Sequence, residues 1–82
     1  MLEEIKNVLQ EELFVEEEIT PTSILKDDLH LDSVAAVELS LQLEEKYDIN
    51  ITEQELVKLV TIQDVMNLLE TKGVGNNEDS KN

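Results

Sequence analysis

The sequence contains no cysteine, one histidine, one proline, two glycines and only two aromatic residues, Tyr47 and Phe14. Without cysteine the chain can form neither disulfides nor thiolate metal sites, and one histidine excludes a histidine-rich ligand set, so we predict no metal site. The few prolines and glycines leave little turn-forming sequence for a many-stranded sandwich or barrel. An all-α fold is therefore favoured, with a core of Leu, Ile and Val in which Tyr47 and Phe14 are the only large rings.

Basic residues are also scarce, with six Lys and Arg against 20 Asp and Glu and a net charge of −14. Phosphate contacts need clustered basic residues, so nucleic-acid binding is excluded and anionic membranes are disfavoured. A strongly acidic protein is attracted instead to basic surfaces on other proteins. No apolar run approaches membrane-spanning length, and residues 1–13 are acidic rather than basic. We therefore expect no membrane insertion and no signal peptide, and predict a monomeric cytoplasmic protein.

Helical spacing of apolar residues predicts the first helix within residues 2–13 and the second over residues 33–47. Residues 15–32 lack this periodicity but contain apolar residues, so we expect this long loop to pack over the helices. Thr52 and Thr61 are each followed by an acidic residue three positions later, a spacing typical of capping boxes. They predict a short third helix to about Leu59 and a last helix that begins near residue 62.

Together these signals predict one small four-helix bundle with a long loop between helices one and two and a short third helix. The bundle is expected to comprise residues 1–72. Gly73 supplies a stop for the last helix, and residues 73–82 are polar and aperiodic, so we predict a disordered tail there.

The second helix has two apolar stripes on nearly opposite sides, whereas an ordinary surface helix needs one. The first stripe, which we expect to face the core, contains Leu39, Leu43 and Tyr47. The second stripe, which we expect to face a partner, has flanking acidic residues. Its members and these neighbours are Val34, Val37 and Leu41, with Glu38, Glu44 and Glu45.

Ser33 lies where the polar loop meets the second helix, in the stretch "DDLHLDSVAAVEL". By position it is an N-cap residue, although Ala36 stands where a capping box would have an acidic partner. A helix N-terminus also favours a phosphate group, so a phosphodiester on Ser33 would be well placed. A catalytic triad of His30, Asp32 and Ser33 is disfavoured, because neighbours on one turn do not converge as a triad requires. We predict no catalytic residues and no enzyme.

The stretches "DLHLDSVAAVELSLQLEEKYDINI" and "LVTIQDVMNLL" resemble the acyl carrier proteins over nearly the whole chain. The resemblance implies that Ser33 carries 4′-phosphopantetheine, which comes from coenzyme A, with Asp32 helping to orient the site. The thiol of that group would hold acyl or aminoacyl cargo as a thioester, so the thiol is imported. The implied partners are a phosphopantetheinyl transferase and cargo-processing enzymes whose basic patches dock on the second stripe.

His30 and Leu31 replace a small Gly–Ala pair that fatty-acid carriers usually have before the Asp-Ser motif, and Ala35 and Ala36 follow the serine. These departures favour a dedicated pathway that makes a polyketide, a peptide-like compound or a cell-envelope product. A housekeeping carrier of fatty-acid synthesis is one alternative. The other is an unmodified acidic helical adaptor that binds a basic protein.

Overall fold

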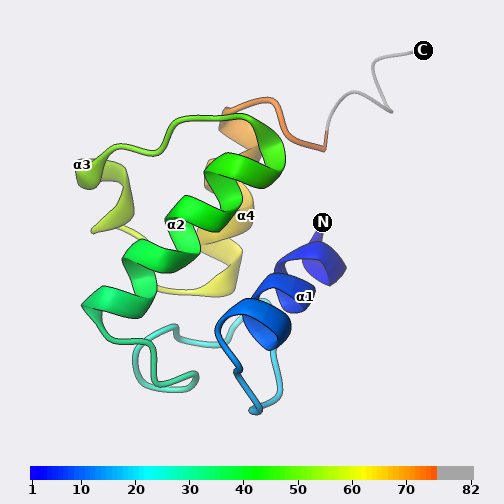
Figure 1. Ribbon diagram of the computed structural model, residues 1–82, viewed down its shortest axis with the longest axis vertical. Helices are drawn as coiled ribbons and strands as arrows, with labels where there is room; N and C mark the ends of the chain where they lie inside the picture. Colours follow the sequence, from blue (N-terminus) through cyan, green and yellow to red (C-terminus); the bar gives the residue numbers. More distant parts are fainter. Residues whose placement is uncertain (76–82) are drawn as a thin grey trace.

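A computed structural model describes residues 1–75, which form four helices joined by irregular segments, the longest of them between the first two helices (Figure 1). The helices are α1 (Leu2–Glu12), α2 (Ser33–Tyr47), α3 (Glu53–Leu56) and α4 (Ile62–Thr71). In Figure 1, α2 crosses in front of α4, with α1 on one side and α3 on the other. The all-α prediction is confirmed, including the long loop before α2 and the short α3.

The fully buried core consists of Leu, Ile and Val, as the composition predicts for most of it. Each helix except α3 contributes buried apolar residues, eight in all, and the α1–α2 loop contributes five more. The buried apolar residues are Ile5, Val8, Leu9, Val15, Ile19, Leu25, Leu29, Leu31, Leu39, Leu43, Ile51, Ile62, Val65 and Leu69. Because residues 15–32 include five of them, this loop packs over the helices as predicted.

The α1–α2 loop is also fastened to the start of α4 by backbone hydrogen bonds. The Leu25 amide donates to the Val60 carbonyl at 2.9 Å, and the Ile62 amide donates to the Ser23 carbonyl at 3.0 Å. An isolated antiparallel bridge between Ile24 and Thr61 lies between these bonds. The loop is therefore held both by apolar burial and by main-chain pairing, which fixes the segment that leads into α2.

Both capping boxes predicted from the sequence are present. Thr52 accepts a hydrogen bond from the Glu55 amide while the Glu55 carboxylate accepts from the Thr52 amide, and Thr61 and Asp64 make the same pair of bonds. Helix α3 ends at Leu56, earlier than the predicted end near Leu59. After Leu56 the hydrogen bonds tighten to three-residue spacing, as in the bond from the Leu59 amide to the Leu56 carbonyl at 3.1 Å.

The prediction that Phe14 is a core residue is wrong, because its side chain is 79% exposed. Phe14 follows the end of α1 with a φ of 58°, and this left-handed backbone turns Val15 into the core and Phe14 outward. Tyr47 is half-buried against the core, as expected. The core therefore has one large ring at its edge rather than two.

At the other end of the chain, the left-handed Gly73 (φ 92°) ends α4, and the amide of the half-buried Val74 donates to the Leu69 carbonyl at 2.9 Å. The rest of the predicted tail, residues 76–82, lies outside the described residues. The predicted boundary between domain and tail stays a prediction.

Candidate functional site

Asp32, not Ser33, is the N-cap of α2. Asp32 has extended backbone angles (φ −82°, ψ −175°), and its carboxylate oxygen Oδ1 accepts a hydrogen bond from the Ala35 amide at 2.8 Å. Ser33 is the first residue with helical geometry, so the interpretation of Ser33 as the cap is wrong. The physical reason is that aspartate caps a helix as well as serine does, and Asp32 is the last residue with non-helical backbone.

The Ser33 side chain is exposed, and within residues 1–75 its hydroxyl takes part in no intramolecular hydrogen bond. The Ala35 and Ala36 amides are satisfied by Asp32, through its side chain and its carbonyl respectively. The amides of Ser33 and Val34 have no acceptor among the described residues. A free hydroxyl thus lies beside two free helix N-terminal amides, a setting that suits an attached phosphate diester.

The segment before Ser33 is anchored by alternating burial. Leu29 and Leu31 are buried, at 2% and 7% exposure, and the Leu31 amide donates to the Leu25 carbonyl at 2.9 Å. His30 between them has a φ of 60° and an exposed side chain. Its Nε2 atom lies 3.6 Å from Oε2 of Glu17. His30 thus contacts the far side of the loop and forms no triad with Asp32 and Ser33.

The two apolar stripes predicted on α2 are both present. Leu39 and Leu43 are each 1% exposed, whereas Val34, Val37 and Leu41 are 75%, 47% and 52% exposed. An aliphatic stripe that begins one residue after Ser33 is therefore left in solvent along the helix. We call Val34, Val37 and Leu41 the outer stripe.

The three acidic residues beside the outer stripe have different surroundings. Glu38 accepts a hydrogen bond from Nε2 of Gln42 at 3.0 Å, and Glu45 is exposed. Glu44 is half-buried, and its Oε2 accepts from the Ile51 amide at 2.7 Å, which ties α2 to the segment before α3. Sequence analysis missed this second role of Glu44, because only the fold brings residue 51 back to α2.

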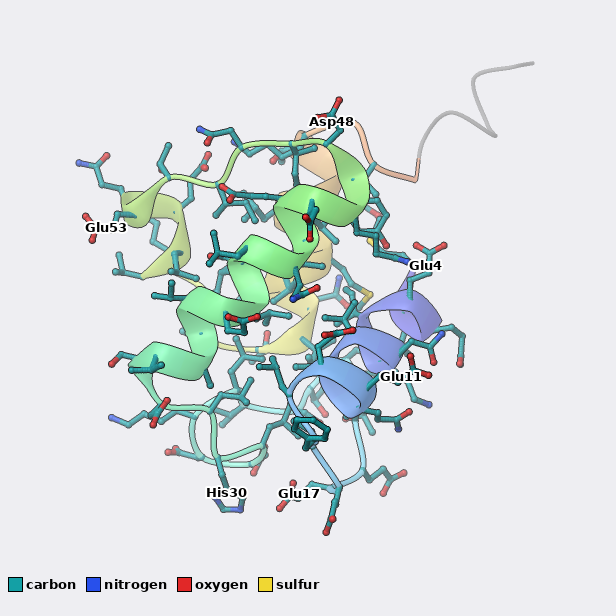
Figure 2. The ribbon with its side chains drawn as sticks, viewed as in Figure 1. Glu4, Glu11, Glu17, His30, Asp48 and Glu53 are labelled. Carbon is teal, nitrogen blue, oxygen red and sulfur yellow. The ribbon has the colours of Figure 1, made fainter. Side chains whose placement is uncertain are left out.

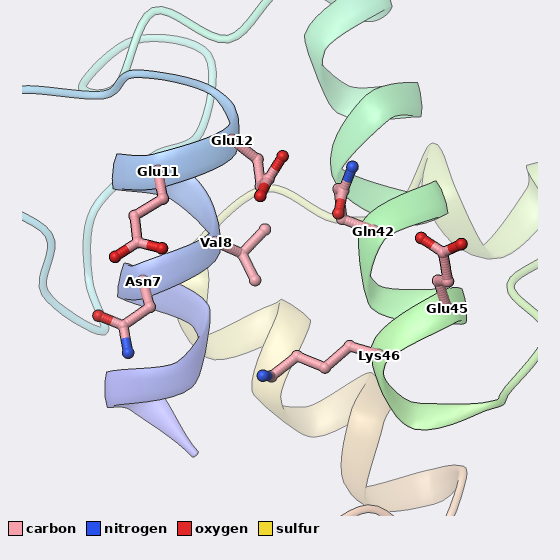
Figure 3. Close-up of a pocket in the computed structure, with 7 residues that line it drawn as sticks. All are labelled: Asn7, Val8, Glu11, Glu12, Gln42, Glu45 and Lys46. Atoms are coloured by element: carbon pink, nitrogen blue, oxygen red, sulfur yellow. The ribbon is translucent and has the colours of Figure 1, made fainter.

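Glu45 also borders a groove of about 250 Å³ between α1 and α2 (Figure 3). Val8 forms part of the groove, with Glu11 and Glu12 contributed by α1 and Lys46 by α2. Within the described residues no group of three or more His, Cys, Asp or Glu side chains could hold a metal ion. No helix in residues 1–75 is long and apolar enough to cross a membrane.

Groups with shifted pKa values lie away from Ser33 in the sequence and serve the fold. Bonds from the backbone amides of Thr61 and Val60 lower the pKa of Asp64, and the hydrogen bond from Lys72 (2.8 Å) lowers the pKa of Glu55. Burial and a hydrogen bond to Glu4 raise the pKa of Tyr47. None of these groups is in the segment around Ser33.

Comparison with known proteins gives consistent matches. A family model described as "Phosphopantetheine attachment site" matches residues 3–69. An acyl carrier protein from Thermosynechococcus vestitus is 36% identical over 73 residues, which cover 88% of this chain and 90% of the relative. One from Campylobacter lari is 39% identical over 71 residues, with coverages of 85% and 92%. The structure of a putative acyl carrier protein from Mycobacterium tuberculosis superposes with a TM-score of 0.78 at 30% identity, covering 84% of this chain and 93% of that one.

Proposed function

The chain belongs to the acyl carrier protein family, and from this premise we propose that Ser33 is the residue to which its 4′-phosphopantetheine is attached. Members of the family are carriers, not enzymes, and have this group covalently bound. The observation that carries the proposal is the exposed Ser33 hydroxyl on the first residue of α2. When bound, 4′-phosphopantetheine supplies the thiol that this cysteine-free chain lacks and holds cargo as a thioester.

The residues around Ser33 have separate tasks in this proposal. Ser33 provides the oxygen that is esterified, and the free amides of Ser33 and Val34 are available to phosphate oxygens. Asp32 holds the first turn of α2 through its bond to Ala35, and so holds the backbone from which Ser33 projects. In this proposal a phosphopantetheinyl transferase deprotonates the hydroxyl and positions coenzyme A.

We propose the outer stripe as the surface for partner enzymes. Burial of Val34, Val37 and Leu41 against a partner would remove apolar area from water. Glu38 and Glu45 would face basic residues on that partner, which favours fast and selective encounter. Glu44 would contribute less than the other two, because its carboxylate already binds the Ile51 amide.

For the pathway, we propose a dedicated route to a polyketide, a peptide-like compound or a cell-envelope product. This proposal is supported by His30, Leu31, Ala35 and Ala36, which make the surroundings of Ser33 bulkier before it and less polar after it. A monomeric cytoplasmic carrier with residues 1–72 as its domain fits the same proposal. Housekeeping enzymes of fatty-acid synthesis that load and turn over this chain as fast as their own carrier would refute the dedicated route.

The test of the attachment site is the intact mass of the protein before and after incubation with coenzyme A, magnesium and a broad-specificity phosphopantetheinyl transferase. The wild type should gain the mass of one phosphopantetheine, and Ser33→Ala should gain none. Ser40→Ala is a matched control, because Ser40 is buried and donates its hydroxyl to the Val37 carbonyl at 2.7 Å. This variant should be modified like the wild type.

An unmodified adaptor remains the second candidate, because the outer stripe and the acidic surface would serve it equally well. A folded wild-type protein that gains no mass, beside a control carrier that does, would favour the adaptor.

A further inference from the structure

Phe14 has the most exposed large apolar side chain in residues 1–75, and packing of the fold does not account for it. Its ring is 79% exposed and contributes nothing to the core cluster, so the gain from burying an aromatic side chain is not realised. Its φ of 58° lies in the left-handed region, which glycine adopts freely and a bulky side chain adopts at a cost. Of the other left-handed positions in residues 1–75, two are glycine, Gly73 and Gly75, and two are polar residues, His30 and Asp48, so Phe14 is the one apolar side chain among them. Folding therefore favours glycine at position 14.

The fold requires the left-handed backbone at position 14, although it does not require the aromatic ring. The left-handed residue reverses the chain at the end of α1, and the Val15 amide then donates to the Leu9 carbonyl at 3.0 Å. Val15 is buried as a result. Because that geometry holds Phe14 away from the core, the ring is presented to solvent by a well-anchored turn rather than by a loose one.

The charge around Phe14 indicates what kind of molecule would cover it. Glu11 and Glu12 precede it, residues 16–18 are all glutamates, and each of these five side chains is exposed. The sequence has no lysine or arginine between Lys6 and Lys26. An anionic lipid surface would be repelled, and a second copy of this chain, with a net charge of −14, would be repelled as well. A protein with an apolar pocket bordered by Lys and Arg has the complementary charge.

The place of Phe14 in the fold relates it to the attachment site. The end of α1 and the start of α2 lie toward the same end of the molecule, where the α1–α2 loop runs (Figure 1). Glu17, three residues after Phe14, lies 3.6 Å from His30, three residues before Ser33 (Figure 2). The turn that presents Phe14 is thus joined through the loop to the segment that presents Ser33.

We propose that Phe14 is a docking residue that enters an apolar pocket, bordered by basic residues, on an enzyme that acts on this carrier. This surface is separate from the outer stripe and selects partners that have such a pocket. The proposal rests on the proposed function, since the partner is taken to handle the loaded carrier.

Phe14→Gly tests both halves of the argument. Glycine relieves the left-handed backbone, so the melting temperature should be equal to or higher than that of the wild type. A melting temperature several degrees lower would show that the ring stabilises the fold and would overturn the proposal. The mass gain at Ser33 with the broad-specificity transferase should be the same for both proteins. If the wild type itself is not loaded, the proposed function fails, independently of Phe14.

The partner is then identified by placing the photo-crosslinker p-benzoylphenylalanine at position 14 in the cells that make this protein. A matched control has it at the exposed Asn67 of α4. The protein crosslinked specifically at position 14 is purified and titrated with the loaded wild type and the loaded Phe14→Gly variant at low and moderate salt. We expect at least tenfold weaker binding by Phe14→Gly, and wild-type binding that weakens as salt rises. Equal affinities, no crosslink above the Asn67 control, or a crosslink to a second copy of this chain would each overturn the proposal.

Discussion

The capping of α2 gives the sharpest prediction, because it separates the stability of the attachment site from its chemistry. Asp32→Ala removes the carboxylate that accepts the Ala35 amide at 2.8 Å and leaves that amide to water. Ser33→Ala removes a hydroxyl with no hydrogen bond within residues 1–75. We therefore expect Asp32→Ala to destabilise the protein and Ser33→Ala to leave its stability nearly unchanged.

The magnitude follows from the geometry of the cap. Replacing an N-cap aspartate by alanine costs about 1 kcal/mol, and for a domain of this size that lowers the melting temperature by roughly 4–8 °C. Ser33→Ala should stay within about 0.5 kcal/mol of the wild type, as is usual for exposed positions without partners. Asp32→Asn should lie between them and close to the wild type, because asparagine caps nearly as well but lacks the charge that interacts with the helix dipole.

The assay is urea unfolding of the unmodified proteins at pH 7 and fixed ionic strength, followed by circular dichroism. The slopes of the transitions should be equal, so that midpoints compare stabilities directly. If Ser33→Ala loses as much stability as Asp32→Ala, then Ser33 is the cap and our assignment of the first turn of α2 is incorrect.

Three further predictions concern the fold. Leu39→Ala should cost about 2–5 kcal/mol because Leu39 is 1% exposed, whereas Leu41→Ala, at a 52% exposed position, should cost about 0.5 kcal/mol or less in the same urea assay. Glu55 and Asp64 have lower pKa values in the folded than in the unfolded chain, so they add stability above the ordinary carboxyl range that is lost as pH falls through it. Protonation of the many other carboxylates also relieves the self-repulsion of the chain, so the expected outcome is a difference between two proteins. Lys72→Gln, which removes the cation bound to Glu55, should have a lower urea midpoint than the wild type at neutral pH, and this gap should narrow as pH falls through the carboxyl range. Finally, salt or magnesium should raise the melting temperature, because screening reduces the self-repulsion of a net charge of −14.

Each of these predictions has an outcome that would contradict it. Equal losses of unfolding free energy for Leu39→Ala and Leu41→Ala would contradict the assignment of Leu39 to the buried stripe of α2 and of Leu41 to the exposed one. A gap between the midpoints of Lys72→Gln and the wild type that is the same at neutral and acidic pH would contradict the role assigned to Glu55. A melting temperature that is the same at low and moderate salt would show that repulsion between the acidic side chains does not destabilise the fold.

Local chemistry was enough to predict much of this protein. A capping box requires only a threonine and an acidic residue three positions later, so Thr52 and Thr61 located the starts of α3 and α4. Helical spacing placed Leu39 and Leu43 opposite the outer stripe without any knowledge of the neighbouring helices. The prediction of Ser33 as the attachment residue, beside Asp32, was instead implied by the resemblance to the acyl carrier proteins, because position alone favoured a helix cap there.

The features that sequence reasoning missed depend on how distant segments meet. Composition suggested that Phe14 is buried, but its orientation follows from the reversal of the chain that brings Val15 into the core. From the sequence, Glu44 is predicted to be a surface charge. In the fold, the chain turns back after α2 and brings the Ile51 amide within hydrogen-bond distance of its carboxylate. Capping boxes and apolar stripes can therefore be predicted from residue types alone, since they depend on contacts between residues within one or two helical turns. Exposure and long-range hydrogen bonding are set when the loop closes over the helices, and that closure depends on all the buried residues together.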